Sequence, residues 1–196
     1  MAQTYAVVRD SSKNFFIAVK NTKGFFFHTD NNGNGVIYQN GTVIKNGPGE
    51  SALPGGGLAA NTDPAIGAAN EFQEETGVEL RNFDGKLMPK EWHGVTGKYE
   101  YYGVYYQFSS AVFNDISSRA IANLRTGADA AAAIRNGKIK TYKDIFKTYP
   151  NCPGDNELAT GSVWNLDRDW SRIQALNNSQ STSWFYEILK NLKNNI

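Results

Sequence analysis

The sequence predicts an α/β protein in which a β-sheet packs against helices. Runs of β-branched and aromatic residues at 4–9, 15–20 and 99–110 are typical of strands. Segments with helix-start and helix-stop residues lie between and after them, at 63–77 and 181–195. A chain of 196 residues, 40% of them hydrophobic, is long enough to bury a sizeable core. We therefore expect a single domain over residues 1–196.

The N-terminal part is predicted to contain only strands. Residues 10–14 are turn formers, so the first two strands are expected to make a hairpin. Residues 23–28 contain three consecutive phenylalanines and predict another strand. Asn40-Gly41 is the strongest two-residue hairpin signal, so 36–38 and 42–44 are expected to pair with each other. His28 stands alone, and a surface or packing role is expected for it.

Residues 53–77 carry the strongest local signals in the chain. Pro54 and the three glycines after it predict a loop without regular structure. Asp63 is expected to cap a helix, with Pro64 at its first position. Gly77 is expected to end that helix.

Three carboxylates share one patch of this predicted helix. Glu71 lies three residues before Glu74 and four before Glu75. Like charges at these spacings destabilise a helix by roughly 0.2–0.5 kcal/mol per pair. A hard divalent cation such as Mg²⁺ would offset this repulsion, because it binds carboxylate and phosphate oxygens. The other interpretation is a solvated acidic helix face.

Residues 56–78 resemble the Nudix box, G-x5-E-x7-R-E-U-x-E-E-x-G-U, where U is a bulky aliphatic residue. The end of the box, Glu-Phe-Gln-Glu-Glu-Thr-Gly-Val, matches at 71–78, with Phe72 at a U position. Two positions depart from the pattern. Thr62 stands where the pattern has Glu, and Asn70 stands where it has Arg. Both members of the family's supporting charge pair are therefore absent together.

The resemblance implies a Nudix-type α/β/α sandwich with a mixed sheet, a helical insertion at 115–149 and a C-terminal helix at 181–195. It also implies a pyrophosphohydrolase that cleaves the diphosphate of a nucleoside diphosphate linked to a group X, such as a nucleotide sugar, ADP-ribose or a dinucleotide, with Mg²⁺ or Mn²⁺ as cofactor. The alternative is a Nudix-fold module that binds a nucleotide or protein and has little or no activity. A secreted effector with Nudix chemistry is a third interpretation.

The resemblance also assigns residues. Metal ligands are expected in the box, at Gly56, Glu71, Glu74 and Glu75. Catalytic carboxylates are expected at Glu71, Glu74 and Glu157. Asp155 is the other acid in the loop that holds Glu157, and one carboxylate in the site acts as general base. Gly55, Gly57 and Trp92 are expected to contact substrate, although an aromatic side chain such as Trp92 also suits a core.

The second half of the chain gives further expectations. Residues 79–83 are expected to begin a strand, and 91–98 to form a polar loop. The strand at 99–110 carries aromatic residues on both faces, so helices are expected on both sides of it. Gly127 is expected to separate two helices of the insertion, and residues 141–144 read as a capping box.

Composition excludes several classes of protein. A net charge of +1 gives no case for bulk binding to nucleic acid or anionic membranes. A single cysteine excludes an internal disulfide. No signal peptide is apparent and no apolar run approaches the ~20 residues of a membrane span. A cytoplasmic protein is expected, with leaderless secretion left open. A homodimer, common in the resembled family, is left open too.

Overall fold

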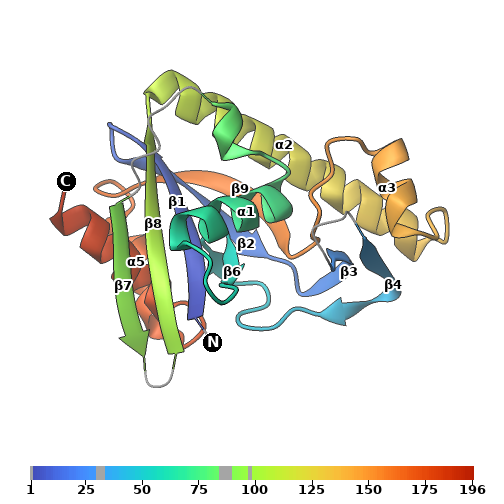
Figure 1. Cartoon of the computed structure of the whole chain (residues 1–196), viewed down its shortest axis with the longest axis horizontal. Coiled ribbons are helices and arrows are strands. Elements are labelled where there is room, and N and C mark those ends of the chain that lie inside the picture. The colour runs from blue at the N-terminus through green and yellow to red at the C-terminus, as the bar shows by residue number, and fades with distance from the viewer. Residues whose placement is uncertain (1, 30–33, 84–89, 97–98) are drawn as a thin grey trace.

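The computed structural model describes residues 2–29, 34–83, 90–96 and 99–196 (Figure 1). Its main sheet is seven-stranded and mixed, with the core order β5-β2-β1-β8-β7, while β6 pairs with β1 and β9 with β2. The strands are β1 (Ala2–Asp10), β2 (Asn14–Lys20), β5 (Ser51–Ala52), β6 (Gly55–Gly57), β7 (Lys90–Thr96), β8 (Tyr99–Phe108) and β9 (Leu158–Asn165). β1 and β8 run parallel, and the other described pairs of this sheet are antiparallel.

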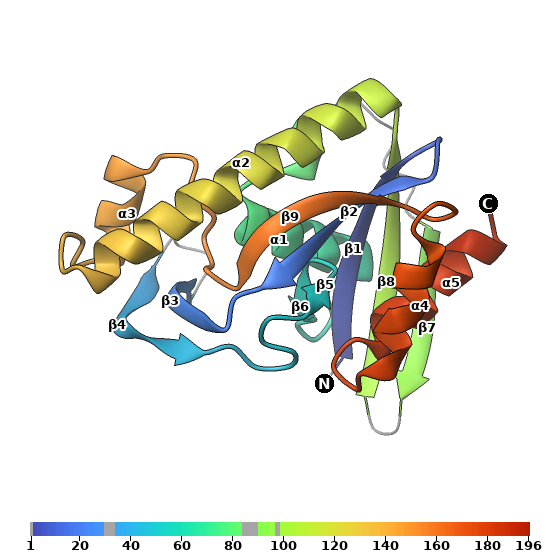
Figure 2. The same ribbon diagram turned by 180° about the vertical axis from the view of Figure 1, so that it is seen from behind.

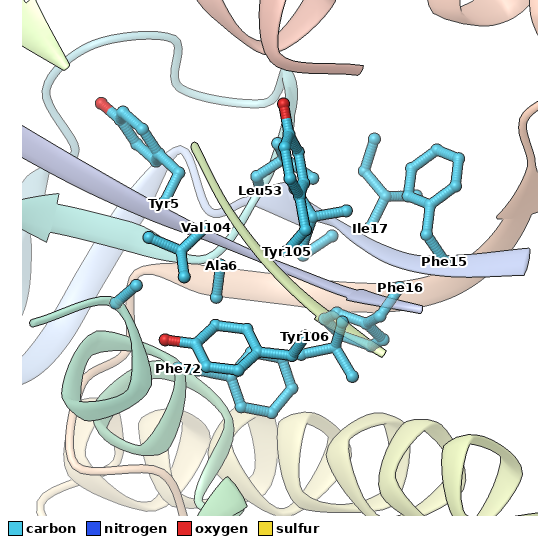
Figure 3. Close-up of a cluster of buried hydrophobic side chains, with 14 of the residues drawn as sticks. Tyr5, Ala6, Phe15, Phe16, Ile17, Leu53, Phe72, Val104, Tyr105 and Tyr106 are labelled. Carbon is cyan, nitrogen blue, oxygen red and sulfur yellow. The ribbon is translucent and has the colours of Figure 1, made fainter. Parts of the chain in front are cut away.

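Helices cover both faces of this sheet, as expected. They are α1 (Pro64–Thr76), α2 (Ser110–Arg135), α3 (Tyr142–Thr148), α4 (Trp170–Ala175) and α5 (Ser183–Asn194). Successive residues of β8 reach opposite layers: the Tyr105 hydroxyl donates to the Ile188 carbonyl of α5, and the Tyr106 hydroxyl donates to the Ala65 carbonyl of α1. Figure 3 shows the two tyrosines pointing to opposite sides of the sheet. The predicted α/β/α sandwich with a mixed sheet is confirmed.

A second, smaller body lies at one end of the sheet; we call it the side unit. It consists of β3 (Lys23–His28), β4 (Gly35–Val43), the C-terminal half of α2, α3 and the loop that follows α3. Figures 1 and 2 show these elements gathered around one end of α2. They share a buried core of their own, made of Phe26, Ala130, Ala133, Ile134, Ile139, Tyr142, Ile145 and Cys152. The side unit therefore unites two excursions of the chain that are far apart in sequence.

The box helix α1 forms as its local signals predict. The Asp63 side chain accepts hydrogen bonds from the first-turn N–H groups of Ala65 and Ile66. Pro64 begins the helix, and Gly77 ends it in the left-handed conformation at φ 70°. The Phe72 side chain is fully buried in the main core. α1 is consequently fixed against the sheet through Phe72.

The predicted hairpin at Asn40-Gly41 is wrong. Gly35–Val43 is one strand, antiparallel to β3, and the pairing passes from Gly24–Thr42 directly to Phe26–Ile37. The extra residues of β4 form a bulge, with Gly41 in the left-handed conformation at φ 66°. Because β3 offers a partner to both ends of β4, the glycine bends the strand instead of reversing it. The Asn and Gly residues of 31–35 predict a turn before β4, and this segment lies mostly outside the described residues.

The insertion differs from expectation in a similar way. α2 begins at Ser110 and continues through Gly127, which is buried and does not break it. A Cβ at Gly127 would lie 3.4 Å from Pro153 Cδ, an ordinary van der Waals distance, so the helix continues through a position where alanine would also fit. The capping box after the helix is confirmed, because the Thr141 hydroxyl accepts the Asp144 N–H at 3.3 Å.

Two segments after the box also differ. Residues 79–83 were expected to begin a strand, but Leu80–Asn82 is a single 3₁₀ turn. Residues 91–98 were expected to form a polar loop, but Lys90–Thr96 pairs along β8 as the edge strand β7, and 97–98 lie outside the described residues. Pairing with a long neighbour thus overrides the polar, glycine-containing sequence. No helix in the described ranges is long and apolar enough to cross a membrane.

Candidate active site

The glycines of the box lie in a short strand, not in the irregular loop expected for them. β6 pairs antiparallel with the start of β1, with Gly55 opposite Tyr5 and Gly56 opposite Thr4. The close approach requires glycine, because a Cβ at Gly55 would lie 2.2 Å from the Thr4 carbonyl oxygen. A Cβ at Gly56 would lie 2.5 Å from Glu71 Oε2. The β6 backbone and the carboxylate of Glu71 are therefore in direct contact.

Glu75 is tied to the same strand from the next turn of α1. Its side chain is 2% exposed, and Oε2 accepts the Gly55 N–H at 2.8 Å. Burial raises the pKa of Glu75 well above its ordinary value, and the negative charge of Glu157 raises it further. The ammonium of Lys20 acts in the opposite direction.

Acids from outside the box join this cluster. Withdrawal from water raises the pKa of Glu71 to about 8, with further contributions from the charges of Glu74, Asp155 and Glu157. Withdrawal from water raises the pKa of Asp155 to about 7, and the charges of Glu74 and Glu157 add to this. The structure thus brings Glu71, Glu74, Glu75, Asp155 and Glu157 within electrostatic reach of one another, so the site carries excess negative charge.

The loop that supplies the last two acids is held in place by its backbone. The Asp155 N–H donates to the Glu74 carbonyl at 3.0 Å, which fastens the loop to the end of α1. Asp155 Oδ1 accepts the His28 N–H at 2.5 Å. The Asn156 side chain is buried and accepts the Phe25 N–H at 3.0 Å. The loop after α3 is therefore hydrogen-bonded both to α1 and to β3, next to the acidic cluster.

Lys20 and His28, which the sequence did not assign to the site, both lie against the cluster. Lys20 Nζ lies 3.4 Å from Glu157 Oε2, and the Lys20 side chain is only 12% exposed. His28 Nδ1 lies 3.6 Å from Glu74 Oε2, so the expected surface or packing role does not describe it. Lys20 ends a strand whose pairing with β9 shifts just there. A lysine at the end of an apolar strand can be recognised in the sequence as a candidate site residue, whereas only the fold brings His28 close to Glu74.

The donor set suits a hard divalent cation. Carboxylate and backbone carbonyl oxygens in an over-charged cluster are what Mg²⁺ and Mn²⁺ bind. However, among the described residues no three Asp, Glu, His or Cys side chains already converge on one ion position. Two contacts already engage these carboxylates: Glu75 accepts the Gly55 N–H, and Glu74 lies 3.6 Å from His28 Nδ1. The donor atoms nevertheless fit such an ion chemically.

Asn70 and Thr62, the two positions that depart from the box pattern, contact different parts of the structure. Asn70 Oδ1 accepts a hydrogen bond from Arg81 Nη2 at 2.9 Å. A guanidinium therefore lies next to the position where the box pattern has Arg, supplied from just beyond the box. Thr62 packs its methyl group 3.9 Å from where a Cβ on Gly67 would lie, in a contact between loop and helix.

An aromatic cavity of about 480 Å³ lies between the start of β1, the start of β8 and α5. Four rings line it, those of Tyr5, Tyr99, Tyr101 and Trp184. Tyr5 is paired in the sheet with Gly55, whose N–H donates to Glu75. Trp92 is not among the residues described as lining the cavity; its ring packs against Tyr101 at 5.5 Å between centroids.

The structure is similar to MutT/Nudix family proteins. A MutT protein from Methanosarcina mazei Go1 aligns over 100% of this chain and 94% of its own, with a TM-score of 0.44 and 11% identity. A mutT/nudix family protein from Listeria innocua aligns over 60% of this chain and 70% of its own, with a TM-score of 0.35 and 14% identity. No family model and no curated protein matches the sequence. At these TM-scores and identities, the likenesses carry no argument about function.

Proposed function

We propose that the protein hydrolyses the diphosphate linkage of a nucleoside diphosphate joined to a group X, with a divalent metal ion as cofactor. The observation that carries this proposal is the contact of Glu71 with Gly56, one turn from the clamp of Glu75 on Gly55. The residues that would hold Mg²⁺ or Mn²⁺ are Gly56, through its carbonyl, with Glu71, Glu74 and Glu75. A bound ion neutralises phosphate oxygens and acidifies water.

The chain's own groups would position the reactants. β6 exposes its backbone at Gly57, where no side chain blocks a diphosphate, whereas Gly55 is buried against β1. A general base must come within about 2.6–3.2 Å of the attacking water. Glu157 suits this role better than Asp155, because its side chain is 31% exposed and lies beside Lys20. Asp155 Oδ1 is already occupied by the His28 N–H.

The aromatic cavity supports a nucleotide-type substrate. Its four rings offer stacking faces, and its rim carries the amides of Gln3, Asn46 and Gln180. Stacking on an aromatic ring is worth ~1–3 kcal/mol per base. No lysine or arginine is among the residues described as lining it, which suits a neutral base.

A second candidate function is a nucleotide-binding module with little or no turnover. The observation that favours it is that Glu74 lies beside His28 and no three ligands converge in the described residues. The replaced Glu–Arg pair at Thr62 and Asn70 points the same way, because the groups that orient metal ligands affect activity.

Hydrolysis of a panel of nucleoside diphosphate derivatives separates the two functions. Wild type, Glu74→Gln and the control Glu187→Gln are compared with Mg²⁺, with Mn²⁺ and with a chelator. Glu187 is 39% exposed beside Lys190 in α5. A hydrolase shows metal-dependent turnover that falls by at least ~100-fold in Glu74→Gln only. Nucleotide binding by calorimetry without turnover on any substrate would establish the module instead.

A further inference from the structure

Glu74 lines a second cavity, of about 560 Å³, and none of the residues described around it also lines the aromatic cavity. One wall is a face of α1, formed by residues at helical spacing: Asn70, Gln73, Glu74 and Gly77. The opposite wall belongs to the side unit, which supplies His28, Phe146 and Gly154. The two excursions of the chain therefore meet the box helix around one hollow.

Two contacts link the residues of the side-unit wall to one another. The Phe146 ring packs edge-on against Tyr142, with 5.1 Å between ring centroids. The Tyr142 hydroxyl donates to the Gly154 carbonyl at 2.9 Å, which links α3 to the loop that carries the acids. A shaped, pre-formed cavity with a few fixed polar groups is the usual form of a small-molecule site.

Glu74 places this cavity next to the acidic cluster. It lines the cavity and lies one helical turn after Glu71, the residue in contact with Gly56. The aromatic cavity is farther from this helix: it is bordered by α5, and Figures 1 and 2 show α5 and α3 at opposite ends of the molecule with α1 between them. Glu74 therefore borders both the acidic cluster and the second cavity.

The chemistry of the two cavities differs. Four rings line the first, whereas Phe146 is the single aromatic ring other than His28 described around the second. Its remaining polar side chains include Gln73, which donates and accepts hydrogen bonds, Glu79, which accepts them, and Arg81, which donates them. One apolar platform beside such groups matches a sugar ring, which has an apolar face and hydroxyls at its edge. A second nucleobase would find Phe146 in place of the four large aromatic rings of the first cavity.

We propose that this cavity binds the sugar of a nucleotide sugar, so that X is a hexose-type sugar. This inference rests on the proposed hydrolase function for its substrate. The side unit is then the element that selects X.

Hydrolysis tests the selection. Hexose esters of ADP, UDP and GDP are compared with dinucleoside diphosphates in the presence of Mg²⁺. The variants are Gln73→Ala and Phe146→Ala, and the matched surface control is Arg119→Ala, which removes an exposed side chain of α2 paired with Asp115. We expect nucleotide sugars to be preferred, and kcat/KM for them to fall about tenfold or more in the two cavity variants only. Equal use of dinucleotides would overturn the inference and leave the hydrolase standing.

A binding measurement is independent of turnover. Calorimetry with the 1-phosphates of glucose, galactose, mannose and N-acetylglucosamine is run with and without saturating nucleoside monophosphate. At least one sugar phosphate is expected to bind without displacing the nucleotide, and about tenfold more weakly to Gln73→Ala. That result without any hydrolysis would refute the hydrolase and keep the sugar site. Failure of all four to bind, displacement of the nucleotide, or unchanged affinity in Gln73→Ala and Phe146→Ala alike would refute the sugar site.

Discussion

The protonation of Glu71 makes the stability of the metal-free protein depend on pH. The folded-state pKa of about 8 lies well above the ordinary value of 4.5. Between these values the folded protein holds a proton that the unfolded chain has released, so stability falls as pH rises through this window. Asp155, raised from 3.8 to about 7, adds a loss of the same sign.

The magnitude follows from the shift. At ~1.36 kcal/mol per pKa unit, it sets a ceiling of ~5 kcal/mol for Glu71. The charges within the cluster are coupled and partly screened by water, so ~2–3 kcal/mol is the expected loss between pH 5 and pH 8. Glu71→Gln keeps the side chain's shape and cannot ionise. At pH 8 without metal it should therefore be more stable than wild type by about this amount, and nearly equal at pH 5.

Urea unfolding followed by circular dichroism in EDTA at pH 5, 6.5 and 8 measures this. Glu187→Gln, which changes an exposed acid of α5, is the matched control and should follow wild type. Mg²⁺ at pH 8 should stabilise wild type more than Glu71→Gln, because the ion offsets a charge that the variant lacks. Parallel loss of stability in wild type and Glu71→Gln would refute the placement of Glu71 in a dehydrated acidic cluster.

Three further predictions follow from single contacts. Gly56→Ala places a Cβ 2.5 Å from Glu71 Oε2, so kcat should fall ~100-fold with a smaller change in melting temperature; an unchanged kcat contradicts the contact. Lys20→Met removes the ammonium that lies 3.4 Å from Glu157, so Mn²⁺ should bind about five- to tenfold more tightly, as measured by calorimetry. Weaker Mn²⁺ binding by this variant would contradict the role of Lys20 as the counter-ion of the cluster. Phe72→Ala empties a fully buried position, so the free energy of unfolding should drop by ~3–5 kcal/mol in urea titrations; a loss below ~1 kcal/mol would mean that α1 is not docked as described.

The box helix shows how far local sequence reaches. Its start at Asp63, its first residue Pro64 and its end at Gly77 were all predicted, because caps act within a few residues. The same local reasoning failed at Asn40-Gly41 and at Gly127. At Asn40-Gly41 the outcome depends on a remote partner, β3, which pairs with both ends of β4. At Gly127 the glycine lies buried within a long helix and does not end it. Glycine permits a turn, and the surrounding structure decides whether one occurs.

The candidate site divides in the same way. Helical spacing placed Glu71, Glu74 and Glu75 on one patch, since that depends only on α1. It could not show that Gly55 holds Glu75, because this hydrogen bond joins a helix to a strand across the fold. Nor could it find the partners that offset the charge, which come from two other strands.

The sequence by itself determined the box helix and the acidic patch, because periodicity and caps are encoded by neighbouring residues, whereas the sandwich was expected from the resemblance to the Nudix box. Only the tertiary structure decided that Lys20 and His28 lie at the cluster and that the side unit forms a second cavity with Glu74. Lys20 and Glu157 are 137 residues apart in the sequence and meet only because β2 pairs with β9, and His28 reaches Glu74 through the side unit, which has a core of its own.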